Sequence, residues 1–170
     1  MFPKPYDLKN KTVNKSLIKI GEMVVLMGFL ESWIESWIWN LIDQRDQNIG
    51  KKITSPLMYR QKVDLLLSLV ESRSPDRVEN FQKIHKKLQA LGERRNNLIH
   101  SQYFLMYGNK KEHLKRDSKK VSLRHGVNKK DGSIDISKVF SDVKLSELTL
   151  IINDIRKYHT ALTKFFILQN

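Results

Sequence analysis

Hydrophobic residues recur at helical spacing over most of this chain. Between residues 14 and 48 they fall alternately three and four positions apart, which predicts one long helix. This first stripe consists of Leu17, Ile20, Val24, Met27, Ile34, Ile38 and Leu41, and Glu31 is the charged position within it. Leu26, Leu30, Trp33 and Trp37 form a second apolar stripe beside the first. We therefore expect this helix to be buried on two sides, by its own bundle and by a partner subunit.

Three further helices are predicted by capping residues and by the same periodicity. The second begins after Thr54-Ser55-Pro56, because Ser is a good N-cap and Pro suits the first turn, and it ends at Ser72. The third begins at Ser74-Pro75-Asp76 and runs through Leu98, as far as Phe104 at most. The last spans residues 145–168. We expect an all-α protein with these helices in an antiparallel bundle of four to five helices, forming a single domain over residues 1–170.

Glycines mark two places where helices could approach closely. Gly21, Gly28 and Ser32 share one face of the first helix and would permit a close helix crossing. Gly92 lies inside the third helix, where it costs about 1 kcal/mol relative to Ala. This cost is small, and the missing side chain would allow close packing shortly before the residues that could carry chemistry.

The segment 107–144 differs from the rest of the chain because it is polar, basic and interrupted by glycines. Two short runs, 121–124 and 134–136, flank Asp131-Gly132, which predicts a small β-hairpin inserted before the last helix. Between residues 108 and 130 there are nine basic residues and two acidic ones, a net charge of +7. Four of these cations are candidate contacts to phosphates: Lys110, Lys111, Lys115 and Arg116.

The overall charge points to a polyanionic partner. The chain has 31 Lys and Arg against 18 Asp and Glu, a net charge of +13. Nucleic acid is the first candidate, and an anionic membrane surface is the second. The chain has no Cys, which excludes a disulfide scaffold, a thiolate zinc site and a cysteine nucleophile. The longest apolar run, residues 23–30, is too short to span a membrane, and no signal peptide is evident, so we expect a cytoplasmic protein.

One short stretch of the third helix combines three groups that suit phosphate chemistry. On a helix that turns about 100° per residue, Asn96 and His100 lie one turn apart on one face, and the long side chain of Arg95 can reach the same rim. A His with a pKa near neutrality can take the proton from a ribose 2′-hydroxyl, and an Arg can stabilise the charge on the phosphate. Asn can orient either partner. Neighbouring Arg94 is a further candidate for substrate binding.

This stretch, Arg95-Asn96-Asn97-Leu98-Ile99-His100, resembles the R-N-x-x-x-H signature of the HEPN superfamily. The helix order resembles that superfamily as well, with a long first helix, the motif late on the third helix, a polar insertion and a closing helix. The resemblance implies a helical bundle that dimerises, so that the motifs of two subunits form a composite ribonuclease site that needs no metal or other cofactor. Arg95, Asn96 and His100 are the residues that match the motif.

The resemblance also implies biological roles. Many members are toxins or phage-defence effectors, often encoded beside a nucleotidyltransferase-like antitoxin, which in some cases modifies a Tyr in R-x4-6-H-x-Y. Here Tyr103 stands one residue later than in that pattern, so its modification does not follow from the resemblance. Other members are inactive, and the alternative interpretation is a helical module that binds nucleic acid or a protein without cleaving anything.

Other residues leave more than one interpretation open. Glu31 is either a tolerated edge residue or an acid that faces the dimer axis and supports the composite site. Trp33, Trp37 and Trp39 are either core residues or platforms for nucleic-acid bases. The histidines outside the motif show no metal-ligand spacing, so we predict no metal site.

Overall fold

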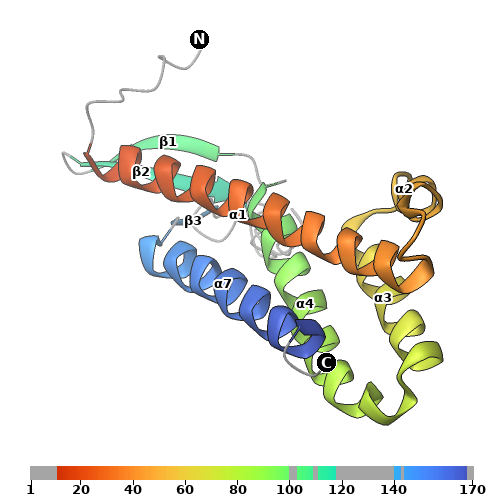
Figure 1. The fold of residues 1–170 in the computed structure, drawn as a ribbon. Helices are drawn as coiled ribbons and strands as arrows, with labels where there is room; N and C mark the ends of the chain where they lie inside the picture. Colours follow the sequence, from red (N-terminus) through yellow and green to blue (C-terminus); the bar gives the residue numbers. More distant parts are fainter. Residues whose placement is uncertain (1–10, 100–102, 109–110, 118–139, 143, 168–170) are drawn as a thin grey trace, which may run out of the picture. The chain divides into compact units, whose positions relative to one another are not determined.

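The computed structural model describes residues 11–99, 103–108, 111–117, 140–142 and 144–167 (Figure 1). The helices are α1 (Lys11–Ile42), α2 (Gln47–Thr54), α3 (Tyr59–Arg73), α4 (Val78–Ile99) and α7 (Leu145–Ile167), and a 3₁₀ turn, η1 (Pro75–Arg77), precedes α4. Three strands, β1 (Tyr103–Gly108), β2 (Lys111–Asp117) and β3 (Phe140–Asp142), lie between α4 and α7 in the sequence. Helices make up most of the described residues, which confirms the prediction of a helical protein. None of the described helices is long and apolar enough to cross a membrane.

The chain divides into two compact units. The first contains residues 1–22 and 95–150, and the second contains residues 23–94 and 151–170. The helices α1, α4 and α7 each continue from one unit into the other. The two units are described separately below.

The predicted first helix is too long, because the chain breaks it into α1 and α2. The break contains two aspartates whose side chains hold the backbone in a turn: Asp43 Oδ1 accepts from the Arg45 amide at 2.8 Å, and Asp46 Oδ1 accepts from the Asn48 amide at 2.9 Å. Asp46 is thereby the N-cap of α2. Aspartates compete with a continuing helix through such local bonds and favour a new helix start instead.

In the second unit, α4 runs antiparallel to both α3 and α7. The contacts that fix these directions are Tyr59–Leu88 and Asp64–His85 between α3 and α4, and Arg94–Asp154 and Phe81–Phe165 between α4 and α7. The prediction of antiparallel neighbours is confirmed for these two helix pairs.

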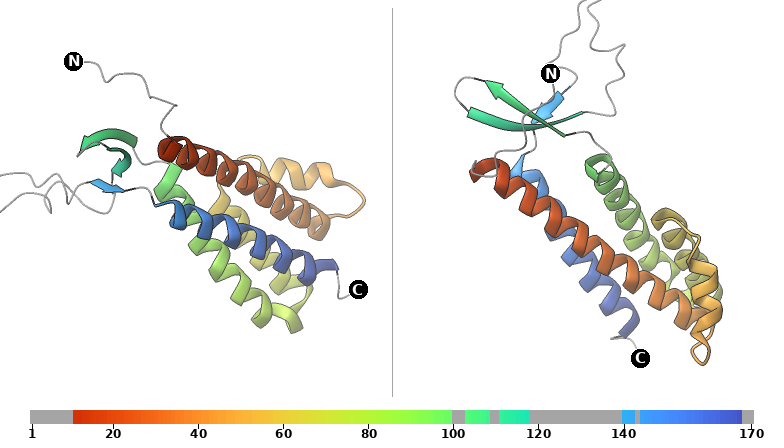
Figure 2. Two further views of the ribbon diagram at one scale, coloured as in Figure 1. Left: turned by 90° about the vertical axis from the view of Figure 1, so that its left-hand side faces the viewer. Right: turned by 90° about the horizontal axis from the view of Figure 1, so that it is seen from above.

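The helices α1 and α7 depart from the predicted antiparallel arrangement, because they run side by side in the same direction (Figure 2). Trp33 contacts His159 with ring centroids 4.7 Å apart, and further along both helices Trp37 stacks on Phe166 at 4.4 Å. Because α3 and α7 are both antiparallel to α4, an α1 helix parallel to α7 also runs in the direction of α3. A short loop between α1 and α3 would have forced those two helices to be antiparallel neighbours. The longer connection through α2 removes that constraint.

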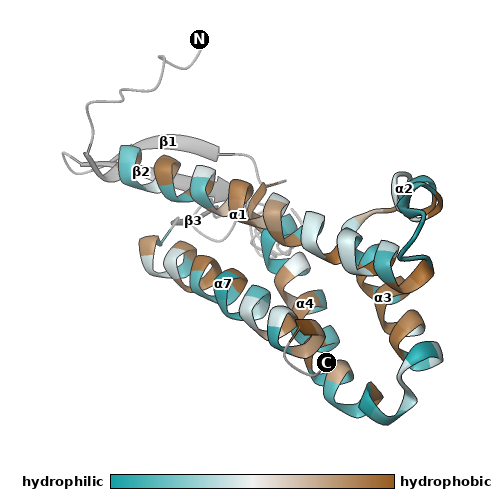
Figure 3. Cartoon of the chain, in the orientation of Figure 1, coloured by the Kyte–Doolittle hydropathy of each residue, from teal (hydrophilic) through white to brown (hydrophobic). Residues whose placement is uncertain are grey.

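The core of the second unit is formed by aliphatic and aromatic side chains from all its long helices. Its fully buried members include Met23, Ile34, Ile38, Leu66, Phe81, Leu88, Leu91, Ile151 and Ile152. Each helix also carries polar turns on its other side, as the hydropathy colouring of Figure 3 shows. Burial of this apolar surface is the main force that holds the unit together.

The first unit contains a small antiparallel sheet with the strand order β1-β2-β3. Tyr103 pairs with Arg116 and Gly108 with Lys111, whereas Lys115 of β2 pairs with Asp142 of β3. The third helix therefore ends before Phe104, which lies in β1, and the basic residues of 111–117 lie on a strand rather than in a loop. The hairpin predicted for 121–124 and 134–136 lies outside the described residues.

Candidate functional site

Arg95 and Asn96 of the motif lie near the C-terminal end of α4. The Nη1 group of Arg95 donates a hydrogen bond to Asn96 Oδ1 at 2.8 Å, so the two side chains are held together. Leu98, two residues on, is fully buried. His100, the third motif residue, lies outside the described residues, one position after the end of α4. Its role stays a prediction.

The guanidinium of Arg95 keeps hydrogen-bonding capacity for an anion. Among the described residues no carboxylate forms an ion pair with Arg95, and its Nε group is buried without a hydrogen-bond partner. A buried donor that lacks an acceptor is unfavourable, and a guanidinium presents five donors in a fork that matches phosphate. Arg95 therefore has no carboxylate partner among the described residues, and its Nε group is closed to solvent.

Arg94 differs from its neighbour because it already has an anionic partner. Its Nη1 group lies 2.5 Å from Oδ2 of Asp154 on α7, and the two side chains are 36% and 20% exposed. Burial and the charge of Asp154 raise the pKa of nearby Tyr158, although Arg94 acts in the opposite direction. This pair fastens α4 to α7 within the second unit. The predicted role of Arg94 in substrate binding would require that pair to open.

The helix that carries the motif is also packed closely against α3. A Cβ atom added to Gly92 would lie 2.6 Å from the ring of Tyr59, and the Tyr59 hydroxyl donates to the carbonyl of Leu88 at 3.2 Å. The missing side chain at Gly92 thus permits a contact that no other residue would allow without a shift. This confirms the expected reason for a glycine at that position.

Three of the predicted phosphate contacts, Lys111, Lys115 and Arg116, lie in the strand β2. Lys110 lies outside the described residues. The sequence signal for this strand pair is the β-favouring run Tyr103-Phe104-Leu105-Met106-Tyr107 followed by Gly108-Asn109.

Sequence reasoning missed the partner of Glu31, which is a lysine of α3. The Nζ group of Lys62 lies 2.6 Å from Glu31 Oε1 and 2.6 Å from Glu35 Oε1, so one lysine of α3 joins two carboxylates of α1. Burial acts to lower the pKa of Lys62, but the hydrogen bonds to Glu31 and Glu35 outweigh burial and raise it. The i, i+4 spacing of the two glutamates was the available signal.

A histidine and an aspartate on different helices also form a pair, which spacing along a single helix cannot predict. His85 Nε2 of α4 lies 2.7 Å from Asp64 Oδ1 of α3, and Gln89 Nε2 donates to the same oxygen at 2.7 Å. Over the described ranges, no group of three or more His, Asp or Glu side chains lies close enough together to hold a metal ion. The pair fastens α3 to α4 and lies apart from the motif residues in the sequence.

The three tryptophans have different surroundings. Trp37 stacks on Phe166, and Trp39 donates from Nε1 to Thr54 Oγ1 at 2.8 Å, so both serve packing. Trp33 is 37% exposed and contacts the edge of His159. The core interpretation is therefore right for Trp37 and Trp39, and Trp33 remains available to a ligand.

Comparison of the chain with protein-family models, curated proteins and solved structures gave no match. The resemblance to the HEPN superfamily therefore depends on the residues from Arg95 to His100 and on the helix order. What the site does chemically is inferred from those side chains and their surroundings.

Proposed function

We propose that this protein is a metal-independent endoribonuclease of the HEPN type that acts as a toxin or phage-defence effector. The observation that carries the proposal is the Arg95–Asn96 pair at the end of α4, where a guanidinium without a carboxylate partner among the described residues lies beside an amide. His100 follows Asn96 at the spacing of one helical turn in the sequence. The chain's net charge of +13 is consistent with RNA as the substrate.

The reaction follows from the chemistry of these groups. His100 takes the proton of the ribose 2′-hydroxyl, and the 2′-oxygen attacks the adjacent phosphorus. The bond from phosphorus to the 5′-oxygen breaks, and a protonated His100 of the composite site donates a proton to that oxygen as it leaves. Arg95 stabilises the charge on the non-bridging phosphate oxygens, and Asn96 orients Arg95 through their hydrogen bond. The products are a 2′,3′-cyclic phosphate and a 5′-hydroxyl.

The proposal includes a homodimer in which the motifs of two subunits form one composite site. A face of α1 supports a second subunit, because Val24 and Val25 are 43% and 57% exposed. A Cβ atom added to Gly28 on the same helix would meet nothing within 4 Å. Exposed apolar surface of this kind is typical of protein interfaces. A nucleotidyltransferase-like antitoxin and a cytoplasmic location belong to the proposal as implications of the resemblance.

Cleavage of single-stranded RNA by purified variants tests the proposed activity. His100→Ala and Arg95→Ala should each abolish cleavage in the presence of EDTA, and Arg95→Lys should recover part of it, because an ammonium lacks the planar fork. Lys87→Ala, an exposed cation on the same helix, is the matched control and should retain full activity.

The nature of the products provides a second criterion. Wild-type protein should leave a 2′,3′-cyclic phosphate, detectable by mass spectrometry. Equal cleavage by wild-type and His100→Ala proteins would mean a contaminating nuclease. In that case the inactive binding module becomes the better interpretation.

A further inference from the structure

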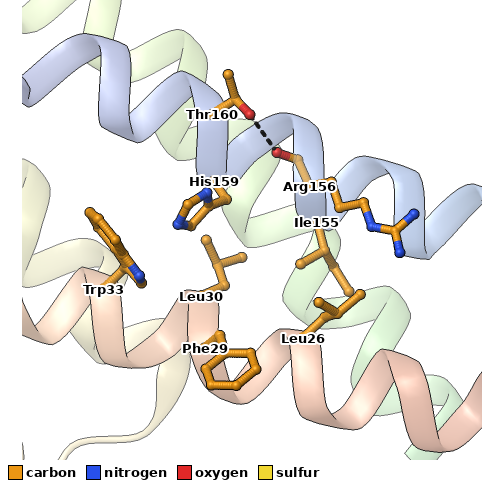
Figure 4. Close-up of a pocket in the computed structure, with 8 residues that line it drawn as sticks. All are labelled: Leu26, Phe29, Leu30, Trp33, Ile155, Arg156, His159 and Thr160. Atoms are coloured by element: carbon orange, nitrogen blue, oxygen red, sulfur yellow. Dashed lines mark hydrogen bonds between the residues drawn. The ribbon is translucent and has the colours of Figure 1, made fainter. Parts of the chain in front are cut away.

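A groove runs between the parallel helices α1 and α7 within the second unit. It has a volume of about 380 Å³, and its floor is apolar, formed by Leu26, Leu30 and Ile155 (Figure 4). Leu30 and Ile155 are 1% and 2% exposed, so the floor belongs to the hydrophobic core. A groove of this size is within the range that binds small molecules or a short segment of a polymer. The side chains of α1 and α7 that line the groove indicate which kind of ligand it binds.

The α1 wall presents aromatic rings to solvent. Phe29 is 61% exposed and Trp33 is 37% exposed, and they lie one turn apart, about 6 Å along the helix axis. The ring of His159 on α7 points toward Trp33 across the groove, with an interplanar angle of 83° (Figure 4). This edge contact orients the Trp33 ring while leaving part of it accessible. The oriented ring of Trp33 and the exposed ring of Phe29 are suited to stack on two flat groups of a ligand.

The α7 wall adds a cation. Arg156 lines the groove one turn away from Thr160, and neither Asp nor Glu is among the residues that line it. A guanidinium beside apolar and aromatic surface favours a ligand that combines flat rings with negative charge.

We propose that this groove binds single-stranded nucleic acid, with bases stacked on Phe29 and Trp33 and a phosphate beside Arg156. Nucleic acid is favoured over other aromatic anions because the aromatic rings repeat along the helix axis and because the chain carries a net charge of +13. Unpaired bases are required, since stacking needs base faces that a duplex conceals. The site extends the proposed function, because it binds the strand through residues that take no part in cleavage.

Binding is measured by fluorescence anisotropy with a labelled oligouridylate and the full-length His100→Ala protein, so that the probe remains intact. Trp33→Leu and Phe29→Leu keep an apolar side chain and remove the aromatic face. Each should weaken the affinity about fivefold or more. Arg156→Gln should weaken it and lower the slope of log affinity against log salt by about one.

Matched controls separate the groove from general effects. Lys157→Gln removes the same charge from the adjacent position of α7, which does not line the groove. Ile49→Ala removes an exposed apolar side chain of α2 that also lies outside it. Both should leave affinity within twofold of the parent protein. Circular dichroism and sedimentation show whether each variant keeps its fold and its oligomeric state.

The outcomes distinguish this proposal from the proposed ribonuclease. Unchanged affinity in Trp33→Leu and Phe29→Leu overturns the groove proposal, as does an equal loss in Lys157→Gln and Arg156→Gln. A change of sedimenting mass with unchanged affinity would assign the groove to contact between two copies of the chain. Equal affinity for a duplex of the same length would show that bases do not stack on these rings, and would overturn the proposal. Failure of the ribonuclease proposal would show differently, as binding through the groove by a wild-type protein that cleaves nothing.

Discussion

The guanidinium of Arg94 lies 2.5 Å from the carboxylate of Asp154, which ties α4 to α7 one residue before the motif begins. The adjacent Arg95 has no such carboxylate among the described residues and bonds to Asn96 instead. Two arginines that are neighbours in sequence thus have different tasks. Arg94 holds two helices together, and Arg95 is the arginine to which we assign a ligand in the proposed function.

Removing either partner of the Arg94–Asp154 pair should destabilise the protein. We expect Arg94→Gln and Asp154→Asn each to lower the free energy of unfolding by about 1–2 kcal/mol, because a charged hydrogen bond is lost in a half-buried place. The double variant should lose less than the sum, since the two residues interact. Urea denaturation measures all three values. Additive losses would show that the pair contributes nothing as a pair.

The same two variants test whether Arg94 binds RNA. If the pair is structural, Arg94→Gln and Asp154→Asn should have similar affinities for RNA. A much weaker affinity in Arg94→Gln alone would restore the role in substrate binding that the sequence suggested.

Lys62 should be the most sensitive lysine of the second unit. Lys62→Met leaves Glu31 and Glu35 without their shared cation, so we expect a loss of about 2 kcal/mol in the free energy of unfolding. Lys83→Met is the matched control, because Lys83 pairs with Glu79 at 3.1 Å but is 64% exposed. Exposed pairs of this type contribute only about 0.3–0.5 kcal/mol. Equal losses in the two variants would contradict the structure of this cluster.

Stability should decrease at alkaline pH because of two groups. The pKa values of Lys62 and Tyr158 are raised above their ordinary values of 10.5 and 10.0. For Lys62 the two glutamates outweigh burial, and for Tyr158 burial acts first and Asp154 second. A group with a raised pKa in the folded state stabilises the fold below its unfolded pKa and loses that contribution as the pH rises through the folded value.

We therefore expect the free energy of unfolding contributed by these two groups to stay constant from neutral pH to about pH 10 and to fall above it. Urea denaturation between those limits and above provides the measurement. Lys62→Met and Tyr158→Phe should each make the alkaline decrease shallower. An unchanged pH profile in both variants would show that other groups cause the decrease.

Two glycines should respond in opposite directions to the same substitution. Gly28→Ala should stabilise the chain by roughly 0.5–1 kcal/mol, because alanine favours the helix and the new methyl group would meet nothing within 4 Å. Gly50→Ala should destabilise it, because the added Cβ would lie 2.8 Å from the Cα of Trp39. Thermal unfolding compares the two variants. Stabilisation by Gly50→Ala would mean that α2 is not packed on Trp39 as described.

The proposed dimer should depend on the exposed apolar face of α1. Wild-type protein should have a mass of about 40 kDa by light scattering, twice the 20.0 kDa of the chain. Val25→Glu places a charge on this face and should yield the monomer. Ile53→Glu, on α2 and 43% exposed, should remain dimeric. A wild-type mass of 20.0 kDa at micromolar concentration would contradict the composite site.

Most of the helical fold could be predicted from the sequence, because burial of an apolar stripe and local capping act over a few residues. The start of the last helix at Leu145 and the start of the third near Pro75 are confirmed within a few residues. The predicted apolar stripe of the first helix is wrong at Val24. Its buried side includes Met23 and Leu30, whereas Val24 is 43% exposed.

The sequence by itself determined the order and spacing of Arg95, Asn96 and His100 along the chain. It also determined the positive charge that favours nucleic acid. The tertiary structure decided which of these groups are already bound. It paired Arg94 with Asp154 and Lys62 with two glutamates, and it placed Trp33 beside His159 on a parallel helix. Periodicity reports which side of a helix is buried, but contacts between helices depend on their direction and register, which only the packing of the whole unit fixes.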